Sequence, residues 1–290
     1  MNNVIKVKDE AEFYHSSEHI GKSQLFKMSK SPAHFKNNLD TPFERTKALL
    51  IGSAFHCLVL EPEKFDEQYA VMPEEFDGRT AAGRAFKRNA EEEGFEILTY
   101  DEYEMIQGMA TSVLSDPYCQ LLLSGEKEIS YYWTDSDTGV KVKCRPDCRT
   151  DLTESSVVVD LKSCENANID AFIRDIFKYG YDLQAAQYTT GVELYEQKKH
   201  KFVLIAVEKK PPYAVLILDF DEVFNGEEKA IMKGYDKYRE FLGLVAECRM
   251  TGVWYDYRGS DDVPGSLNIP QWLKEERMIN DGKNTLEKAD

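Results

Sequence analysis

The stretch that most constrains this chain is Val157-Val158-Val159-Asp160-Leu161-Lys162, in which three β-branched residues precede an acid and a base. Three consecutive valines predict a short strand that is buried on both faces. Residues two apart on a strand point to the same side, so Asp160 and Lys162 would face one pocket. A second acid, Asp147, lies thirteen positions upstream of Asp160 (160 − 147) and follows an Arg-Pro pair.

An acid and a base at the end of a buried strand need compensation, because unpaired buried charges are costly. A divalent cation between Asp147 and Asp160 would supply it, and so would a plain ion pair between Asp160 and Lys162. Two carboxylates that hold Mg²⁺, with a lysine that activates water or stabilises transition-state charge, are typical of metal-dependent phosphodiesterases.

Length and composition indicate a globular chain. Its 290 residues, 42% of them hydrophobic, suffice for one large domain or two small ones. No run of about 18 apolar residues is present and the first ten residues are polar, so we expect neither a membrane span nor a secretory signal. We therefore expect a cytoplasmic protein with six reduced cysteines. Cys144 and Cys148 bracket Asp147 without zinc-ligand spacing, which indicates small buried residues.

The charge is strongly acidic but uneven. A formal net charge of −16 argues by itself against nucleic-acid binding, which normally requires a basic balance. Residues 61–77 carry seven acids and one base, whereas residues 140–149 carry four bases and one acid. An acidic exterior with local basic stripes still fits a DNA enzyme, and it would discourage indiscriminate binding to duplex surfaces.

The pattern of elements predicts a mixed α/β core with an N-terminal helical annex. We expect one domain over 23–272, a flexible N-terminus over 1–22 and a flexible tail over 273–290. The helix over 41–60 would begin at the capping box Thr41-Pro42-Phe43-Glu44. The expected helices are 24–29, 41–60, 81–93, 101–115, 117–123, 168–178, 182–197 and 227–250. The expected strands are 65–72, 128–134, 140–150, 157–163, 202–207 and 214–220, with a loop over 254–270.

Several motifs together resemble a known superfamily. Pro146-Asp147 followed by Asp160-Leu161-Lys162 resembles the signature of PD-(D/E)xK nucleases. Gly52-x-x-x-His56 resembles the helical element of the RecB-like exonuclease branch, in which the histidine is a metal ligand. Gln184-x-x-x-Tyr188 resembles the Q-x-x-x-Y helix motif of that branch, and its two residues would share one helix face. The resemblance implies a restriction-endonuclease-like core, a mixed central sheet flanked by helices.

Within that branch the chain is similar to RecE-type exonucleases (exonuclease VIII-like) over roughly residues 23–272. Any one of the matching motifs is weak, but five in the right order are specific. Cys148 follows Asp147 where these enzymes usually have Arg or Lys. The matching segments are Ser31-Pro32-Ala33-His34-Phe35, Glu128-x-Ser130-x-x-Trp133, Thr138-Gly139-Val140, Cys144-Arg145-Pro146-Asp147 and Val159-Asp160-Leu161-Lys162-Ser163.

The resemblance implies a role for each site residue. Asp147 and Asp160 would share Mg²⁺, or Mn²⁺ as a substitute, and His56 and the Leu161 carbonyl would complete the protein shell. Glu128 would bind metal directly or through water. The catalytic set is therefore Asp147, Asp160, Lys162 and Glu128, the metal set is His56, Asp147, Asp160 and Leu161, and the DNA-binding set is Gln184, Tyr188, Arg145 and Tyr181.

Each of these residues also has a purely structural interpretation. His56 could be a core histidine, Glu128 a solvated charge at a strand edge, and Gln184 with Tyr188 ordinary helix packing. Glu126 competes with Glu128 as the upstream acid; we favour Glu128 because it immediately precedes the apolar strand. Tyrosine at a helix boundary, as at Tyr181, is commonly structural.

The resemblance implies a Mg²⁺-dependent exonuclease that digests linear double-stranded DNA from 5′ to 3′ and leaves 3′ single-stranded overhangs for recombination by strand annealing. Relatives are usually prophage-encoded, form a ring around the duplex and act with a RecT-like single-strand annealing protein, which implies a homo-oligomer, perhaps a tetramer. Three alternatives stay open: a PD-(D/E)xK nuclease of other polarity or an endonuclease, a non-catalytic DNA-binding or phage module with the same fold, and a small-molecule α/β enzyme.

Overall fold

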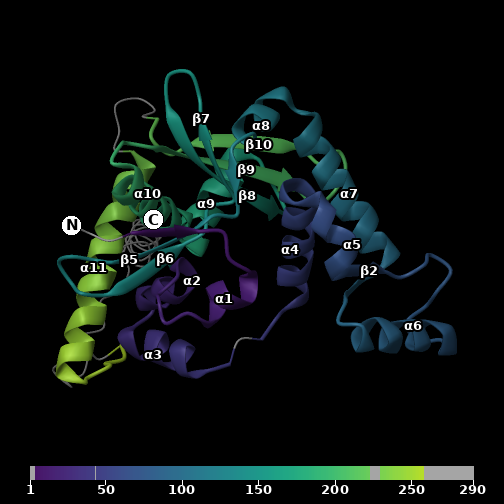
Figure 1. Cartoon of the computed structure of the whole chain (residues 1–290), viewed down its shortest axis with the longest axis horizontal. Coiled ribbons are helices and arrows are strands. Elements are labelled where there is room, and N and C mark those ends of the chain that lie inside the picture. The colour runs from purple at the N-terminus through teal and green to yellow at the C-terminus, as the bar shows by residue number, and fades with distance from the viewer. Residues whose placement is uncertain (1–3, 43, 223–228, 258–290) are drawn as a thin grey trace, which may run out of the picture.

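The computed structural model describes residues 4–42, 44–222 and 229–257. Its largest sheet has five strands in the order β10-β9-β8-β7-β4 (Figure 1). Strands β8 and β9 are parallel, and the other neighbouring pairs are antiparallel. The strands are β4 (Glu126–Lys127), β7 (Cys148–Asp151), β8 (Ser156–Cys164), β9 (Lys201–Glu208) and β10 (Val215–Asp219). The predicted mixed α/β class and the strands predicted over 157–163, 202–207 and 214–220 are confirmed.

A second sheet includes the N-terminal residues. It has the order β1-β5-β6, with β1 at Ile5–Val7, β5 at Ser130–Thr134 and β6 at Lys141–Cys144. Helix α1 (Ala11–Ser16) follows β1, and the buried Ile20 donates its N–H to the carbonyl of Lys141 at 2.9 Å. Residues before the predicted boundary at 23 thus pair with strands of the core.

The strand pair predicted over 128–134 and 140–150 is broken in the middle. The strand predicted over 128–134 is confirmed as β5, and the short β4 precedes it. The single strand predicted over 140–150 is wrong, because that segment divides into β6 and β7. Pro146 cannot donate a backbone hydrogen bond, which ends β6. On the facing segment, between β4 and β5, Glu128 has φ +55°, in the left-handed region, which interrupts the pleat. The two breaks face each other, because the N–H of Glu128 donates to the carbonyl of Asp147 at 3.2 Å.

Strand β8 separates two hydrophobic clusters, because its side chains alternate between the faces of the sheet. Val158 packs in one cluster, with residues of α10 and α11, whereas Val157, Val159 and Leu161 pack in the other, with residues of α4 and α7. Burial of each valine contributes about 1.5–3 kcal/mol. The helices are α4 (Lys47–Leu60), α7 (Tyr100–Ser115), α9 (Ile169–Tyr179), α10 (Tyr181–Glu196) and α11 (Ala230–Thr251), and those predicted over 168–178, 182–197 and 227–250 are confirmed.

The N-terminal helices begin at other residues than predicted. The short helix predicted over 24–29 is present as α2 (Lys22–Leu25) and the 3₁₀ turn η1 (Phe26–Ser29), but α3 (Pro32–Asp40) was not predicted. It begins at Pro32 because proline suits the first helical position and the Ser31 side chain accepts from the N–H of His34. The capping box predicted at residue 41 is wrong, since α4 begins only at Lys47, where the Thr46 hydroxyl accepts from the N–H of Leu49.

Seven further elements lie between α4 and β4 among the described residues. The strand predicted over 65–72 is wrong for its first half, which forms helix α5 (Phe65–Gln68) after the 3₁₀ turn η2 (Pro62–Lys64). Its second half is β2 (Tyr69–Val71), which pairs in parallel with an unpredicted strand, β3 (Glu96–Leu98). Helices α6 (Ala81–Glu92) and α8 (Pro117–Leu122) agree with the predictions, and α7 is capped by Thr99 instead of Asp101.

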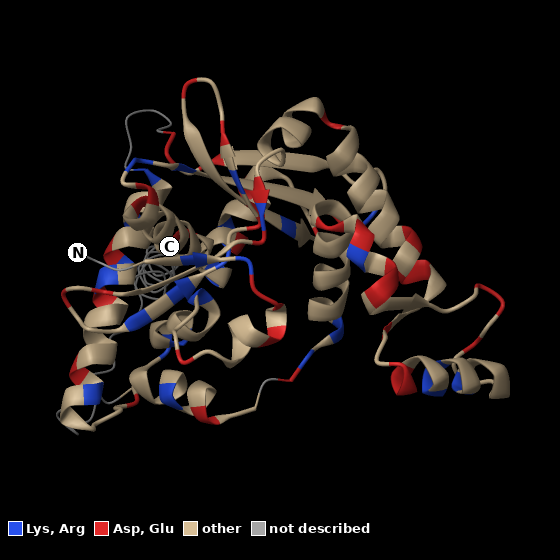
Figure 2. Ribbon diagram, viewed as in Figure 1, with Lys and Arg blue, Asp and Glu red and all other residues tan. Residues whose placement is uncertain are grey.

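The charge pattern follows these elements. Figure 2 shows acidic residues on α5 and the first turn of α7, and lysines along β6. Among the described helices, none is long and apolar enough to cross a membrane. The loop predicted over 254–270 is described only to residue 257, and the predicted tail over 273–290 lies outside the described residues.

Helices α10 and α11 pack closely at Gly234, which gives a test of the fold. A Cβ on Gly234 would lie 1.9 Å from the backbone oxygen of Asp182. Gly234→Ala should therefore destabilise the protein by about 1–3 kcal/mol and lower Tm by roughly 2–10 °C in thermal unfolding. Gly243 lies on the same helix, is exposed and has open space around its Cα, so Gly243→Ala should keep or raise Tm. Equal losses in both variants would contradict this packing.

Candidate metal centre

Three predicted site residues come together where the two sheets diverge. His56 lies on α4, Glu128 between β4 and β5, and Asp147 between β6 and β7. One ligand atom from each lies within 4.8 Å of the others. The Nδ1 atom of His56 is 3.4 Å from Oδ1 of Asp147. One imidazole nitrogen and two carboxylates form a donor set that fits a divalent cation such as Mg²⁺ or Mn²⁺.

The Asp147 side chain is held by a backbone group of strand β8. Strand β7 begins at Cys148, whose backbone pairs with Val159, so β7 does not extend to Leu161 on β8. The Asp147 carboxylate satisfies a backbone N–H of β8 beyond the end of β7, because its Oδ2 accepts from the N–H of Leu161 at 2.5 Å. Its other oxygen, Oδ1, then faces His56. The interruption between β6 and β7 thus positions this carboxylate toward the candidate metal centre.

Glu128 has a strained backbone and a perturbed pKa. A non-glycine residue at φ +55° costs on the order of 1–3 kcal/mol, and such residues cluster at functional sites. Burial, followed by repulsion from Asp147, raises the pKa of Glu128 from 4.5 to about 7. A cation at this position would relieve that repulsion, so the half-buried acid fits a metal ligand better than a solvated strand-edge charge.

His56 and Asp147 stabilise each other's charged form. Burial lowers the pKa of His56, but the Asp147 carboxylate outweighs burial and holds that pKa above its ordinary value. Burial raises the pKa of Asp147, yet His56 and Lys162 together hold it below its ordinary value. The pair therefore favours an ionised carboxylate, the form a cation needs.

Asp160 makes a different set of contacts from those predicted for a metal ligand. It is 1% exposed, forms an ion pair with Lys162 and accepts a hydrogen bond from Nε2 of Gln184 on α10. Burial raises the pKa of Asp160, Lys162 opposes this rise, and Asp147 adds to it. The plain ion pair expected from the sequence is thus present, and a direct role of Asp160 as a metal ligand stays a prediction.

The remaining predicted residues lie at varying distances from the cluster. Tyr181 begins α10, and Lys162 Nζ lies 5.4 Å from the centre of its ring. Tyr188 is partly buried one helical turn beyond Gln184, and Leu161 is buried on β8. Arg145 points elsewhere: its guanidinium forms an ion pair with Asp9 and donates to the Ser130 hydroxyl at 2.8 Å. Their DNA contacts stay predictions.

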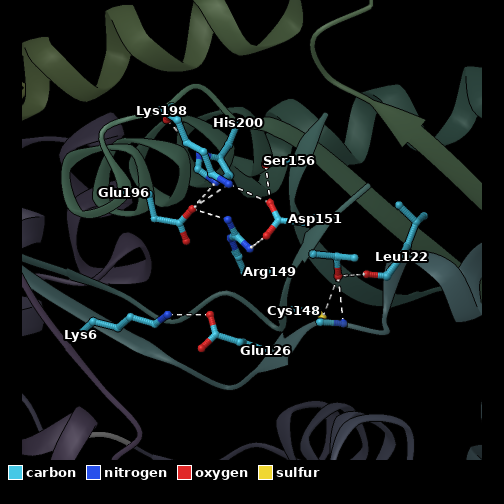
Figure 3. A network of polar contacts seen from close by, with 12 residues as sticks. Lys6, Leu122, Glu126, Cys148, Arg149, Asp151, Ser156, Glu196, Lys198 and His200 are labelled. Atoms are coloured by element: carbon cyan, nitrogen blue, oxygen red, sulfur yellow. Dashed lines mark hydrogen bonds and ion pairs between the residues drawn. The ribbon is translucent and has the colours of Figure 1, made fainter. Parts of the chain in front are cut away.

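Glu126, the competing upstream acid, lies outside the cluster. It forms an ion pair with Lys6 at 2.6 Å, at the edge of the contacts drawn in Figure 3. The centre of that figure is a separate network in which Arg149 joins Asp151 to Glu196, and Glu196 also accepts from His200 at 3.1 Å. These charges compensate one another and tie β7 to the end of α10, which is a structural role.

One residue beside the site was not found from the sequence. Lys22, the first residue of α2, donates to the carbonyl of Tyr179 at 2.6 Å, and its Nζ lies 5.2 Å from the centre of the Tyr181 ring. Burial, followed by repulsion from Lys162, lowers the pKa of Lys22 to about 7. A lysine in a basic stretch normally indicates a solvated surface, so no sequence signal distinguishes it.

Comparison with known proteins places the chain in a family. The model of the family described as a PDDEXK-like domain of unknown function matches residues 21–263. A solved structure from Eubacterium rectale, provisionally described as an exonuclease, aligns with a TM-score of 0.55 at 16% identity. That alignment covers 93% of this chain and 98% of the other, and it supports the fold alone.

Two further comparisons carry no weight for function. The solved protein SSO0001 aligns at a TM-score of 0.31 and 13% identity over 76% of this chain and 84% of that one, which is too low to support an argument. Among curated proteins, none matches this chain. The family match covers most of the chain, including every residue of the cluster. The chain therefore belongs to the family of PDDEXK-like domains.

Proposed function

We propose that this protein is a divalent-metal-dependent deoxyribonuclease. The observation that carries the proposal is the His56–Glu128–Asp147 cluster, whose ligand atoms lie within 4.8 Å of one another beside the buried Asp160–Lys162 pair. A donor cluster next to a lysine on a buried strand is an arrangement suited to metal-dependent phosphodiester hydrolysis. The family match to PDDEXK-like domains supports the same chemistry.

Each residue of the site has a distinct proposed role in hydrolysis. His56, Glu128 and Asp147 would hold the cation, which when bound lowers the pKa of water and polarises the phosphate. The N–H of Leu161 fixes the Asp147 carboxylate, and Gln184 fixes that of Asp160. Asp160 and Asp147 raise the pKa of Lys162 despite its burial, so its ammonium stays charged. That charge is suited to orient the attacking water or to offset the charge that develops on the phosphate.

We further propose the RecE-type activity that the motifs imply. The enzyme would use Mg²⁺ to digest linear duplex DNA from 5′ to 3′, leaving 3′ overhangs for strand annealing. A ring-shaped homo-oligomer would keep it on DNA without an ATPase, and a RecT-like annealing protein would take up the overhang. These finer points are supported by the sequence resemblance and by the cluster's donor types.

End-labelled digestion tests the proposal directly. Linear duplex labelled at the 5′ or the 3′ ends is incubated with the purified protein and Mg²⁺, next to a closed circle. We expect early release of the 5′ label, persistence of the 3′ label and an intact circle. Early release of the 3′ label indicates the other polarity, and cutting of the circle indicates an endonuclease. If wild type and Asp160→Ala leave linear DNA equally intact, the nuclease proposal fails.

A further inference from the structure

The ammonium group of Lys22 is unusual because it forms no ion pair within the described segments, and only the more distant carboxylates of Asp160 and Asp182 favour its charged form. None of the carboxylates in the described segments forms an ion pair with Lys22. Its contacts are the Tyr179 carbonyl and the rings of Phe26 and Tyr181, at 5.4 and 5.2 Å from Nζ. Removing an ammonium from water without an opposite charge is costly, so an anion from outside the chain is the natural complement.

This ammonium lies close to the proposed catalytic lysine. The ring of Tyr181 contacts both ammonium groups, because Nζ of Lys22 and Nζ of Lys162 lie 5.2 and 5.4 Å from its centre. Lys162 is neutralised by Asp160, whereas Lys22 is not. An anion bound by Lys22 would therefore be separated by the Tyr181 ring from Lys162, the lysine proposed to act on the scissile phosphate.

An exposed aromatic ring lies next to this pair. Tyr179, the last residue of α9, is 45% exposed, and its ring centre is 5.9 Å from that of Tyr181 at an angle of 35°. The Nζ atom of Lys178 lies 4.8 Å from the centre of the Tyr179 ring. Aromatic rings interleaved with cations bind single-stranded nucleic acid, because bases stack on the rings and phosphates pair with the cations.

We propose that Lys22 and Tyr179 form a subsite for an unpaired nucleotide next to the scissile phosphate. Lys22 binds the phosphate of that nucleotide, and Tyr179 stacks on its base. The inference rests on the proposed nuclease function and adds the state of the substrate: a base that stacks on Tyr179 has left its complementary strand. The enzyme then acts on a frayed end, and opening of the terminal base pair precedes cleavage.

The phosphate contact is tested through the salt dependence of binding. Binding of a single-stranded oligonucleotide is measured with EDTA present, so that no cleavage occurs, for wild type, Lys22→Met and Lys22→Arg. Loss of one phosphate contact in Lys22→Met should reduce the slope of log K against log [salt] by about 0.7, and Lys22→Arg should keep it. Lys27→Met, at an exposed position of η1, is the matched control. An unchanged slope in Lys22→Met, or an equal reduction in Lys27→Met, overturns the phosphate contact.

Stability distinguishes this role from a structural one. Replacing a half-buried ammonium that has no ion-pair partner by methionine of similar length should keep or raise Tm. A lysine needed for packing would instead lower Tm in Lys22→Met and leave the salt slope unchanged.

The base contact is tested with an abasic nucleotide. An oligonucleotide with a single abasic position is scanned from its 5′ end, and one position should weaken wild-type binding by about 5- to 150-fold. In Tyr179→Ala the same lesion should have little further effect, whereas Tyr179→Phe should behave as wild type. Tyr118→Ala, an exposed tyrosine on α8, is the control. If the lesion weakens Tyr179→Ala as much as wild type, the stacking role is wrong.

These outcomes are separable from the nuclease proposal, because binding is measured without cleavage. A wild type that cleaves linear DNA while Lys22→Met and Tyr179→Ala bind normally would overturn the subsite alone. A wild type that fails to cleave would overturn the nuclease proposal whatever the variants bind.

Discussion

Asp147→Asn is expected to reduce the cleavage of linear duplex DNA by at least about 10²–10³-fold, because it removes the charge at the centre of the cluster. The asparagine keeps the volume of the side chain and can still accept from the N–H of Leu161, so the fold should persist. Loss of the carboxylate leaves burial as the dominant influence on His56, whose pKa should fall below its ordinary value. Initial rates and an NMR titration of the His56 ring measure the two effects.

The matched control for this variant lies four residues along the chain. Asp151 is the last residue of β7, its side chain is 58% exposed, and it forms an ion pair with Arg149. Asp151→Asn removes the same charge at a position away from the cluster, so cleavage should stay within about two-fold of wild type. Full activity in Asp147→Asn, or an equal loss in both variants, would contradict the proposed centre.

Glu128→Gln is expected to stabilise the metal-free protein at high pH. Between pH 4.5 and about 7 the folded protein keeps a proton on Glu128 that the unfolded chain has released. The unfolded state then binds fewer protons, so the free energy of unfolding falls as the pH rises through this window. The neutral glutamine avoids this loss, which gives the variant an advantage on the order of 1–3 kcal/mol at about pH 8 that shrinks toward about pH 5.

Divalent cations should reverse that order. Binding to the ionised cluster stabilises the folded state, so Mg²⁺ or Mn²⁺ should raise Tm of the wild type at about pH 8 and raise Tm of Glu128→Gln much less. Thermal unfolding with EDTA or with added metal measures both effects. Glu126→Gln, two residues away and paired with Lys6, should follow the wild type in both conditions. Identical metal responses of wild type and Glu128→Gln would remove Glu128 from the cluster.

The parts of the fold predicted correctly are those with strong local signals. The three valines of β8 indicate burial without reference to the rest of the chain, and they are buried. Helix α9 begins where predicted because Asn168 accepts from the N–H of Asp170, a short-range capping contact. In the site, the resemblance to RecE-type motifs selected His56, Glu128 and Asp147 among other residues, and the fold brings these three together.

The parts predicted wrongly depend on longer-range contacts or on competing local signals. Nothing in the alternating pattern from Ile129 onward shows that Glu128 adopts a positive φ, because that conformation is fixed by the facing break at Asp147. Near the N-terminus the observed helix caps are Ser31 and Thr46 instead of the predicted Thr41. The sequence likewise did not decide between a cation and Lys162 as the partner of the Asp160 carboxylate, because either would compensate its charge.

The pairing and burial of β8 also bear on which parts of the site can move. The strand is paired with β9 from Val157 to Cys164 and with β7 as far as Val159, and hydrophobic clusters cover both faces. We therefore expect the backbone that carries Asp160 and Lys162 to be well protected from exchange with solvent. His56 and Glu128 come instead from a helix and from an interrupted strand. We therefore expect access to the site to depend on movement of α4 and of the segment around Glu128, while β8 stays in place.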